Sequence, residues 1–246
     1  MLKRTKNRII GFSALVSLLG LLIFTVASTA YGVVKAVLDI DLESYFTETV
    51  DGYTYRCYHI KDAEGGSTDD IAVAFGGDYS ATTAEDTITV PSTITHSSTT
   101  YTVKAIAEGG FRYTNFSEIN IPQTVEEMRE ESFAYCQNIV HFSIPHLVNK
   151  IYPSTFLDCR ALESIYYTNE TGAKTFGNNV ITEIGDHAFD SCVALRDFFS
   201  PRKNVYYGES CFQNCQSLIN FYFPSTIKEN NVIQNYITVR PFALAN

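Results

Sequence analysis

The apolar positions from residue 101 onward repeat in a fixed frame. A phenylalanine recurs at intervals of 22, 23, 33 and 23 residues, as Phe111, Phe133, Phe156, Phe189 and Phe212. An apolar residue stands five positions before each of them: Ile106, Met128, Ile151, Ile184 and Tyr207. A cysteine stands three positions after the last four: Cys136, Cys159, Cys192 and Cys215. Self-similarity of this period is the sequence signature of a solenoid, in which each repeat packs only on its neighbours.

Each unit closes on a run that predicts a short strand. Apolar residues alternate with polar or exposed ones, as in Phe142 and Ile144, and this period of two is that of a strand. A proline ends the run in four units, at 122, 145, 201 and 224, and proline cannot donate to a ladder. We therefore expect a mainly β solenoid of about five and a half 22–23-residue units with a parallel sheet, formally of the α/β type.

Two irregularities interrupt this frame. The 33-residue interval is a normal unit with about ten extra residues, in the loop NETGAKTFGNN around residues 169–179. A sixth copy begins late, with Ile237 and Phe242 in the usual five-residue relation. We interpret it as a half-unit that either caps the solenoid or marks a longer protein.

Residues 31–100 have a different pattern. The segments YTYRCYHI, IAVAF, TITVPSTI and TYTVKAI are rich in β-branched and aromatic residues, and Gly-, Ser-, Thr- and Asp-rich connections separate them. Solenoids need a terminal unit that covers the open end of the core. We therefore predict a β-rich capping module over 31–100 and the repeats over 101–246.

Residues 1–30 have the pattern of an export signal. A basic start, MLKRTKNR, precedes the uncharged apolar stretch 9–27, and Ser28-Thr29-Ala30 supplies small residues for cleavage. The apolar stretch of 19 residues just reaches the length that spans a bilayer, so an uncleaved membrane anchor is the alternative. Either interpretation predicts a secreted or cell-surface protein.

The charge disfavours one class of partner. Without residues 1–30 the chain has 14 basic and 27 acidic residues, a net charge of −13. A surface this acidic repels phosphate backbones and anionic lipid, so we expect neither nucleic acid nor a membrane surface as partner, apart from the possible N-terminal anchor.

The repeat resembles a known family. Units such as ITEIGDHAFDSCVALRDFFSP and MREESFAYCQNIVHFSIP are similar to the BspA-type leucine-rich repeat, whose signature is Ile-Gly-x-x-Ala-Phe-x-x-Cys-x-x-Leu followed by an apolar strand and Pro. The match departs at Thr168, which replaces the proline, and only one unit keeps Ile184-Gly185. The resemblance implies a surface or secreted protein, with adhesion to host or matrix proteins in some members, and no catalytic residues.

The cysteines leave two interpretations open. Six cysteines in an exported chain suggest disulfides, but four of them occupy one repeat position, which favours a buried, reduced column. Cys57 and Cys211 lie outside that column. Neither the cysteines nor the five histidines show a metal-site spacing, and no catalytic motif is present. We expect a protein that is not an enzyme and needs no metal or cofactor.

The outward side of the predicted strands holds the candidate site. One column is polar and contains His141, Asp197 and Asn220, and its neighbour contains the three aromatic residues Tyr166, Phe199 and Tyr222. Clustered exposed aromatics mark a protein or carbohydrate contact surface, although cross-strand pairing that only stabilises the sheet is the alternative. We predict that these six residues line the concave binding face.

These patterns favour a non-catalytic binding or adhesion module for an extracellular protein or glycan. The alternative is a structural spacer or a fragment of a larger envelope adhesin without a ligand site of its own. An exported enzyme would need a catalytic constellation that the sequence lacks.

Overall fold

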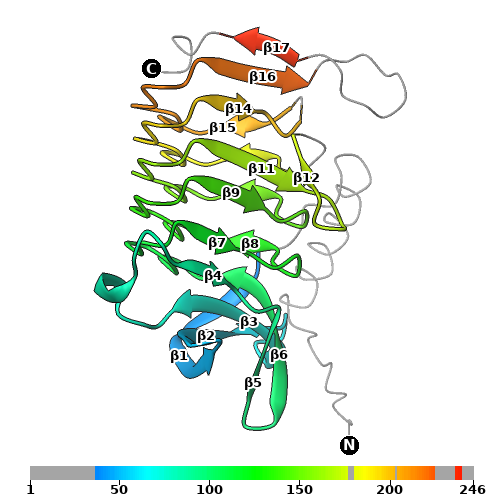
Figure 1. Cartoon of the computed structure of the whole chain (residues 1–246). Coiled ribbons are helices and arrows are strands. Elements are labelled where there is room, and N and C mark those ends of the chain that lie inside the picture. Colours follow the sequence, from blue (N-terminus) through cyan, green and yellow to red (C-terminus); the bar gives the residue numbers. More distant parts are fainter. Residues whose placement is uncertain (1–36, 177–179, 203, 225–235, 240–246) are drawn as a thin grey trace, which may run out of the picture. The chain divides into compact units, whose positions relative to one another are not determined.

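The computed structural model describes residues 37–176, 180–202, 204–224 and 236–239 (Figure 1). The chain divides into two compact units, Met1–Val37 and Leu38–Asn246, and the account below concerns the second. The predicted export signal lies outside the described residues. Among the residues that are described, no helix is long and apolar enough to cross a membrane.

The N-terminal part forms a six-stranded sheet. Its strands are β1 (Asp39–Val50), β2 (Tyr53–Lys61), β3 (Ser67–Phe75), β5 (Thr93–His96) and β6 (Thr99–Ile106), in the order β1-β2-β3-β6-β5, with β8 (Glu127–Met128) paired to β6. The β1–β2 turn is Asp51-Gly52, and both residues have positive φ, 50° and 84°, as a two-residue hairpin loop requires. A short 3-10 helix, η1 (Tyr79–Ala81), lies in the connection to β4. The strands expected in the capping module are therefore present.

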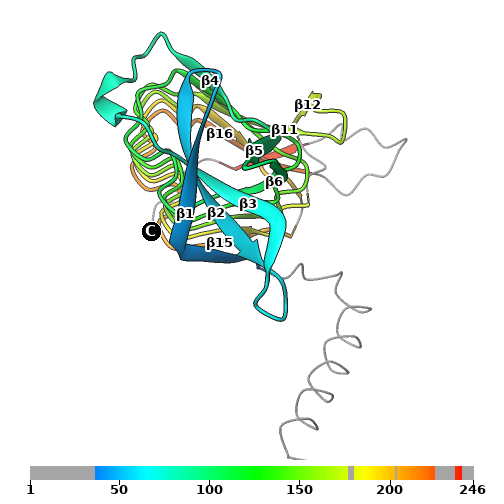
Figure 2. The same cartoon turned by 90° about the horizontal axis from the view of Figure 1, so that it is seen from below.

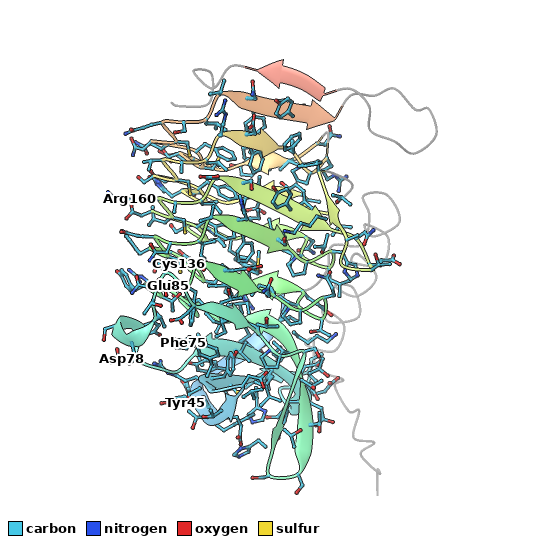
Figure 3. All side chains as sticks on the ribbon, viewed as in Figure 1. Tyr45, Phe75, Asp78, Glu85, Cys136 and Arg160 are labelled. Carbon is cyan, nitrogen blue, oxygen red and sulfur yellow. The ribbon has the colours of Figure 1, made fainter. Side chains whose placement is uncertain are left out.

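This sheet and the repeats share one core. Most buried apolar residues form one cluster from Tyr55 to Phe221, and Ala72, Ala74, Ala105 and Ala107 form a second, small one. The ring of Phe75, at the end of β3, lies 6.3 Å from that of Phe111, the first phenylalanine of the repeat (Figure 3 labels Phe75). The predicted boundary at residue 100 stays a prediction, since β6 runs across it.

The repeats stack as coils with a strand on each of two sides. One side holds β4 (Thr87–Thr89), β7 (Glu118–Asn120), β9 (His141–Ile144), β11 (Ser164–Thr168), β14 (Asp197–Phe199) and β16 (Asn220–Pro224), which Figure 1 shows one above another. The pairs β4–β7, β9–β11 and β14–β16 are parallel. Apart from β4, which lies in the segment expected to be the capping module, these are the strands, and the direction of pairing, that the alternating pattern predicted.

A second ladder lies on another side of the coils. After β8 it continues through β10 (Lys150–Ile151), β13 (Glu183–Ile184) and β15 (Tyr206–Tyr207), of which the last three pair in parallel. Each strand ends on the apolar residue five positions before the phenylalanine. Strands of two residues are too short to show an alternation, so the sequence did not predict them.

The phenylalanines form a continuous stack inside the coils. Successive rings from Phe111 to Phe212 are 5.8, 5.5, 5.2 and 5.2 Å apart and nearly parallel, with interplanar angles of 16° down to 5°. Figure 2, which looks along the stack of coils, shows the coils lying over one another. Offset stacking of aromatic rings adds stability beyond the burial of their surface.

The corner around each phenylalanine needs left-handed backbone. The residues two positions before and two after it have positive φ in every coil, for example Ser154 at 54° and Asp158 at 56° around Phe156. This conformation lets the corner amides point at the next coil. The amide nitrogens of Ser154, Phe156 and Asp158 donate to carbonyls of residues 186, 188 and 190 at 2.8 to 2.9 Å. The coils are thus hydrogen-bonded at their corners as well as along their strands.

The repeated cysteines are part of the core, as expected. Cys136, Cys159 and Cys192 are fully buried, and Cys215 is partly buried. Each thiol donates to the carbonyl of the phenylalanine one coil earlier, at 3.0 to 3.2 Å. Burial raises the pKa of Cys136 and of Cys215 to about 12, so these thiols stay protonated and unreactive at neutral pH. Cys211 belongs to a separate column of small buried residues with Ser132, Thr155 and Ala188.

The last described strand does not continue the repeat. β17 (Tyr236–Val239) pairs antiparallel with β16, and Ile237 lies opposite Phe223. We expected Ile237 to take the position of Ile184 and Tyr207, which lie in the other ladder; that expectation was wrong for this residue. Phe242 lies outside the described residues.

Candidate ligand-binding surface

Four aromatic rings follow one another on the outward side of the stacked strands β11, β14 and β16. They are Tyr166 of β11, Phe176 just after β12 (Lys174–Thr175), Phe199 of β14 and Tyr222 of β16. The ring centroids are 5.7 Å apart from Tyr166 to Phe176, 4.6 Å from Phe176 to Phe199 and 4.5 Å from Phe199 to Tyr222. We call these four residues the aromatic row.

The strand register places the row there. Phe199 pairs with Tyr222 and Tyr166 pairs with Ser143 in the parallel ladders, so their side chains leave the sheet on the same side. The residues just before them in the chain, Ile165, Phe198 and Phe221, point the other way and are at most 3% exposed. The row is therefore held on strands whose opposite face is anchored in the core.

Phe176 is the member that the sequence interpretation missed. It comes from the insertion in the long unit, where β12 pairs antiparallel with β11 and carries the chain back across the sheet. Its ring lies between Tyr166 and Phe199, and 49% of Phe176 remains exposed. The three predicted aromatics are thus not consecutive neighbours. A single aromatic residue in an otherwise polar loop was the signal available in the sequence.

The predicted polar residues form the neighbouring column and bond to each other across the coils. His141 Nδ1 lies 2.7 Å from Ser164 Oγ, and the His141 ring is 6.1 Å from that of Tyr166. Asn220 Nδ2 donates to Asp197 Oδ1 at 2.7 Å. Tyr222 also donates to this oxygen, at 3.5 Å. Partial burial, followed by the Asp197 carboxylate, raises the pKa of Tyr222 above its usual range. These side chains are therefore held in place by one another.

Two further features border the row. The ammonium group of Lys174 lies 4.9 Å from the centre of the Tyr166 ring, within the range of a cation–π contact. Across the polar column, a surface hollow of about 480 Å³ is lined by Glu163, Ala194, Arg196, Gln216, Ser217 and Ile219. The surface thus combines apolar ring edges, a cation and a shallow depression within a few coils.

The acidic side chains and histidines of the described residues do not gather into a metal-binding cluster. Among them, no group of three or more His, Cys, Asp or Glu side chains could hold a metal ion. Two histidines are hydrogen-bonded to neighbouring side chains. His141 bonds to Ser164, and His187 bonds to Asp190 at 3.0 Å.

The family of this chain follows from its repeats. The family described as BspA type leucine rich repeat region matches residues 92–181 and 175–238, in six copies. This is more than half of the chain, so the chain belongs to that family, and the resemblance of its repeat units is confirmed. No curated protein matches the sequence.

Three solved structures are similar to part of this chain. A leucine-rich repeat protein from Bacteroides ovatus is 22% identical, with a TM-score of 0.49, over 76% of this chain and 40% of that one. The pneumococcal vaccine antigen PcpA is 14% identical, with a TM-score of 0.50, over 72% of this chain and 50% of that one. A leucine rich cell surface protein from Faecalibacterium prausnitzii is 19% identical, with a TM-score of 0.40, over 74% and 56%. The chain spans less than two thirds of each of these proteins.

Proposed function

We propose that this chain is an exported or cell-surface, non-catalytic binding module that holds an extracellular protein or glycan on the aromatic row. The observation that carries the proposal is the set of four rings brought together from three strands and an inserted hairpin. A contiguous apolar patch at a protein surface commonly marks an interaction site, and aromatic residues dominate the energy of many interfaces.

The inserted hairpin supports binding over simple sheet pairing. Cross-strand aromatic pairs stabilise a sheet without any insertion, and Phe199 with Tyr222 would already form such a pair. The insertion adds a fourth ring, Phe176, that leaves half of its surface exposed. A purely structural pairing would gain little from a ring that stays so accessible. Export is supported by the pattern of residues 1–30 and by membership of the repeat family.

The alternative function is a spacer within a larger envelope adhesin. The observation that favours it is length, because the chain covers 40% and 50% of two structures of the same fold. A spacer predicts that the row variants described next leave adhesion of the whole protein unchanged.

The test compares capture by the secreted chain and by a row variant. Purified extracellular proteins and glycans are screened with the wild type, with Tyr166, Phe199 and Tyr222 all changed to Ser, and with Tyr206→Ser. Tyr206 is the matched control, since it is 66% exposed on the other ladder. We expect the triple variant alone to lose its ligand while it keeps a cooperative thermal transition. Equal capture by all three proteins would rule out the row as the site.

A further inference from the structure

We propose that Gln123 is a positioning residue for the aromatic row. Its side-chain oxygen holds the base of the inserted hairpin, two coils further along, and thereby keeps Phe176 in the row. This inference rests on the proposed function, because it explains how the fourth ring of that surface is held in place. It follows from the hydrogen bonds of Gln123, from the departure of Thr168 from the repeat and from the small size of the hairpin.

The hairpin is too small to be stable by itself. Two residue pairs join β11 and β12, Tyr167 with Thr175 and Thr168 with Lys174. The turn between the strands is closed by Asn169, whose amide nitrogen donates to the carbonyl of residue 173 at 3.0 Å. An isolated two-stranded hairpin is marginally stable at best in water. This hairpin therefore needs contacts with other coils to hold one position.

Gln123 provides such a contact at the base of the hairpin. The hydroxyl of Thr168, the last residue of β11, donates to Gln123 Oε1 at 2.8 Å. The same oxygen lies 3.0 Å from Nδ1 of His146, in the coil between, and accepts from the backbone nitrogen of His146 at 3.4 Å. A backbone N–H can only donate, so the oxygen of the carboxamide, and not its nitrogen, faces these groups. The Gln123 side chain thus ties three successive coils together.

The turn of the hairpin lies next to the same side chain. A Cβ on Gly172 would lie 3.9 Å from Cγ and 4.0 Å from Nε2 of Gln123. Gly172 has a φ of 80°, and its amide nitrogen donates to the Asn169 carbonyl at 2.8 Å, so it is part of the turn itself. Removal of the Gln123 side chain would therefore take away a neighbour of both the base and the turn.

Thr168 is the residue at which this unit departs from the repeat. The strand ends on a proline in the other four units, and proline fixes φ and has neither an N–H nor a hydroxyl. Thr168 instead lets β11 run on into the hairpin and supplies the hydroxyl that donates to Gln123. This hydroxyl also lies 3.2 Å from the carbonyl oxygen of Ile144, the longer of its two contacts. Thr168 is 6% exposed, so its hydroxyl depends on such protein acceptors.

The position of the hairpin sets the position of the Phe176 ring, because Phe176 directly follows β12. Its ring centroid is 5.7 Å from that of Tyr166 and 4.6 Å from that of Phe199. A small movement of the hairpin is enough to separate rings at these distances. Gln123 acts on the row through Thr168 and the hairpin, which makes it a positioning residue and not a member of the binding surface.

The experiment follows the Phe176 ring by fluorine NMR of the secreted chain labelled with para-fluorophenylalanine. Ring currents of the neighbouring aromatic residues displace its resonance from the position in the unfolded chain, and the resonance that is missing in Phe176→Ser identifies it. The wild type is compared with Gln123→Ala, Thr168→Val and Gln123→Glu. Gln137→Ala is the matched control, since Gln137 Nε2 also donates across coils, to Asp158 Oδ2 at 3.0 Å, but at their corner.

We expect the Phe176 resonance to move toward its unfolded position in Gln123→Ala and in Thr168→Val. It should stay in place in Gln123→Glu, which keeps the accepting oxygen, and in Gln137→Ala. Apart from the resonance of Phe199, which neighbours the ring, the other fluorine resonances and the thermal transition should stay close to those of the wild type, because the change is local.

Amide hydrogen exchange of the turn gives a second measurement. The amide nitrogens of Gly172 and Ala173 donate to the carbonyl oxygen and to Oδ1 of Asn169, at 2.8 and 3.0 Å. These two amides should exchange roughly tenfold faster in Gln123→Ala, and at the wild-type rate in Gln123→Glu.

Three results would overturn the inference. In the first, the Phe176 resonance and the turn amides of Gln123→Ala match the wild type. In the second, all resonances move and the melting temperature falls steeply, so that Gln123 supports the whole fold and not the hairpin. In the third, Gln123→Glu behaves like Gln123→Ala, so that the accepting oxygen is not what matters. None of these measurements uses a bound partner, so failure of the ligand screen refutes the proposed function separately.

Discussion

The thiol of Cys159 donates a hydrogen bond to the carbonyl oxygen of Phe133, one coil earlier, across 3.1 Å. The same bond recurs in the other three coils that have the cysteine. In the first unit Thr114 occupies the position and donates within its own coil, to the carbonyl of Phe111 at 2.8 Å. Buried carbonyls need a donor, and the thiol supplies one to the preceding coil. This explains the repeat position as a structural one, without a disulfide.

Alkaline pH should destabilise the fold through these thiols. Burial raises the pKa of Cys136 from 9.0 to about 12, so the folded form keeps a proton that the unfolded form loses. The stabilisation is complete below pH 9 and is lost as pH rises from 9 toward 12, by about 1.4 kcal/mol per pH unit for each thiol. Urea unfolding between pH 7 and 11 measures this slope. Cys136→Ser keeps a donor without the titration and should reduce the slope by one thiol; an unchanged slope would contradict the account.

The phenylalanine stack should be the most sensitive part of the core. Phe156 is fully buried between the rings of Phe133 and Phe189. Phe156→Ala should lower the free energy of unfolding by roughly 3–5 kcal/mol, because it removes a large side chain and leaves a cavity. Phe176→Ala is the matched control, since that ring is 49% exposed, and it should cost far less. If denaturant unfolding showed the same loss of free energy of unfolding in both variants, the phenylalanine stack would not be the main source of core stability.

Gly185 lies where two coils come close together, and it should not tolerate a side chain. A Cβ on Gly185 would lie 2.6 Å from the backbone nitrogen of Pro153. Since backbone atoms cannot move aside like a flexible side chain, Gly185→Ala should destabilise the protein by roughly 1–3 kcal/mol, the range of overpacked sites. Gly172→Ala in the inserted turn tests positive φ alone, because its Cβ would have its nearest neighbour at 3.9 Å. Thermal unfolding of the two variants separates crowding from backbone strain.

The left-handed corners make an independent prediction. Ser154 has a φ of 54°, which a β-branched residue adopts only with strain. Ser154→Val should destabilise by roughly 1–2 kcal/mol, whereas Ser154→Gly should be near neutral. The comparison needs only chemical denaturation at neutral pH. Equal effects of Val and Gly would show that the corner does not require this conformation in solution.

The sequence predicts the ladder of β7, β9, β11, β14 and β16 because each strand alternates one buried and one exposed residue. The same alternation places Tyr166, Phe199 and Tyr222 on one face. It does not predict Phe176, because the antiparallel return of β12 is set by pairing with β11 and not by any local pattern. The left-handed corners were not predicted either, because their residues range from Ser154 and Asp158 to Tyr113, Glu131 and His187 and share no turn motif. The packing of Phe75 on Phe111 was not predicted either, because it is a contact between residues that are distant in the sequence.

The central claim is that the four rings act together as a binding surface, and Phe176→Ser tests it most directly. The ligand captured by the wild-type chain is titrated against Phe176→Ser and against Tyr206→Ser, an exposed aromatic residue on the other ladder. We predict a dissociation constant at least tenfold higher for Phe176→Ser, about 1.4 kcal/mol, with an unchanged thermal transition and unchanged binding by Tyr206→Ser. Wild-type affinity in Phe176→Ser would contradict the claim.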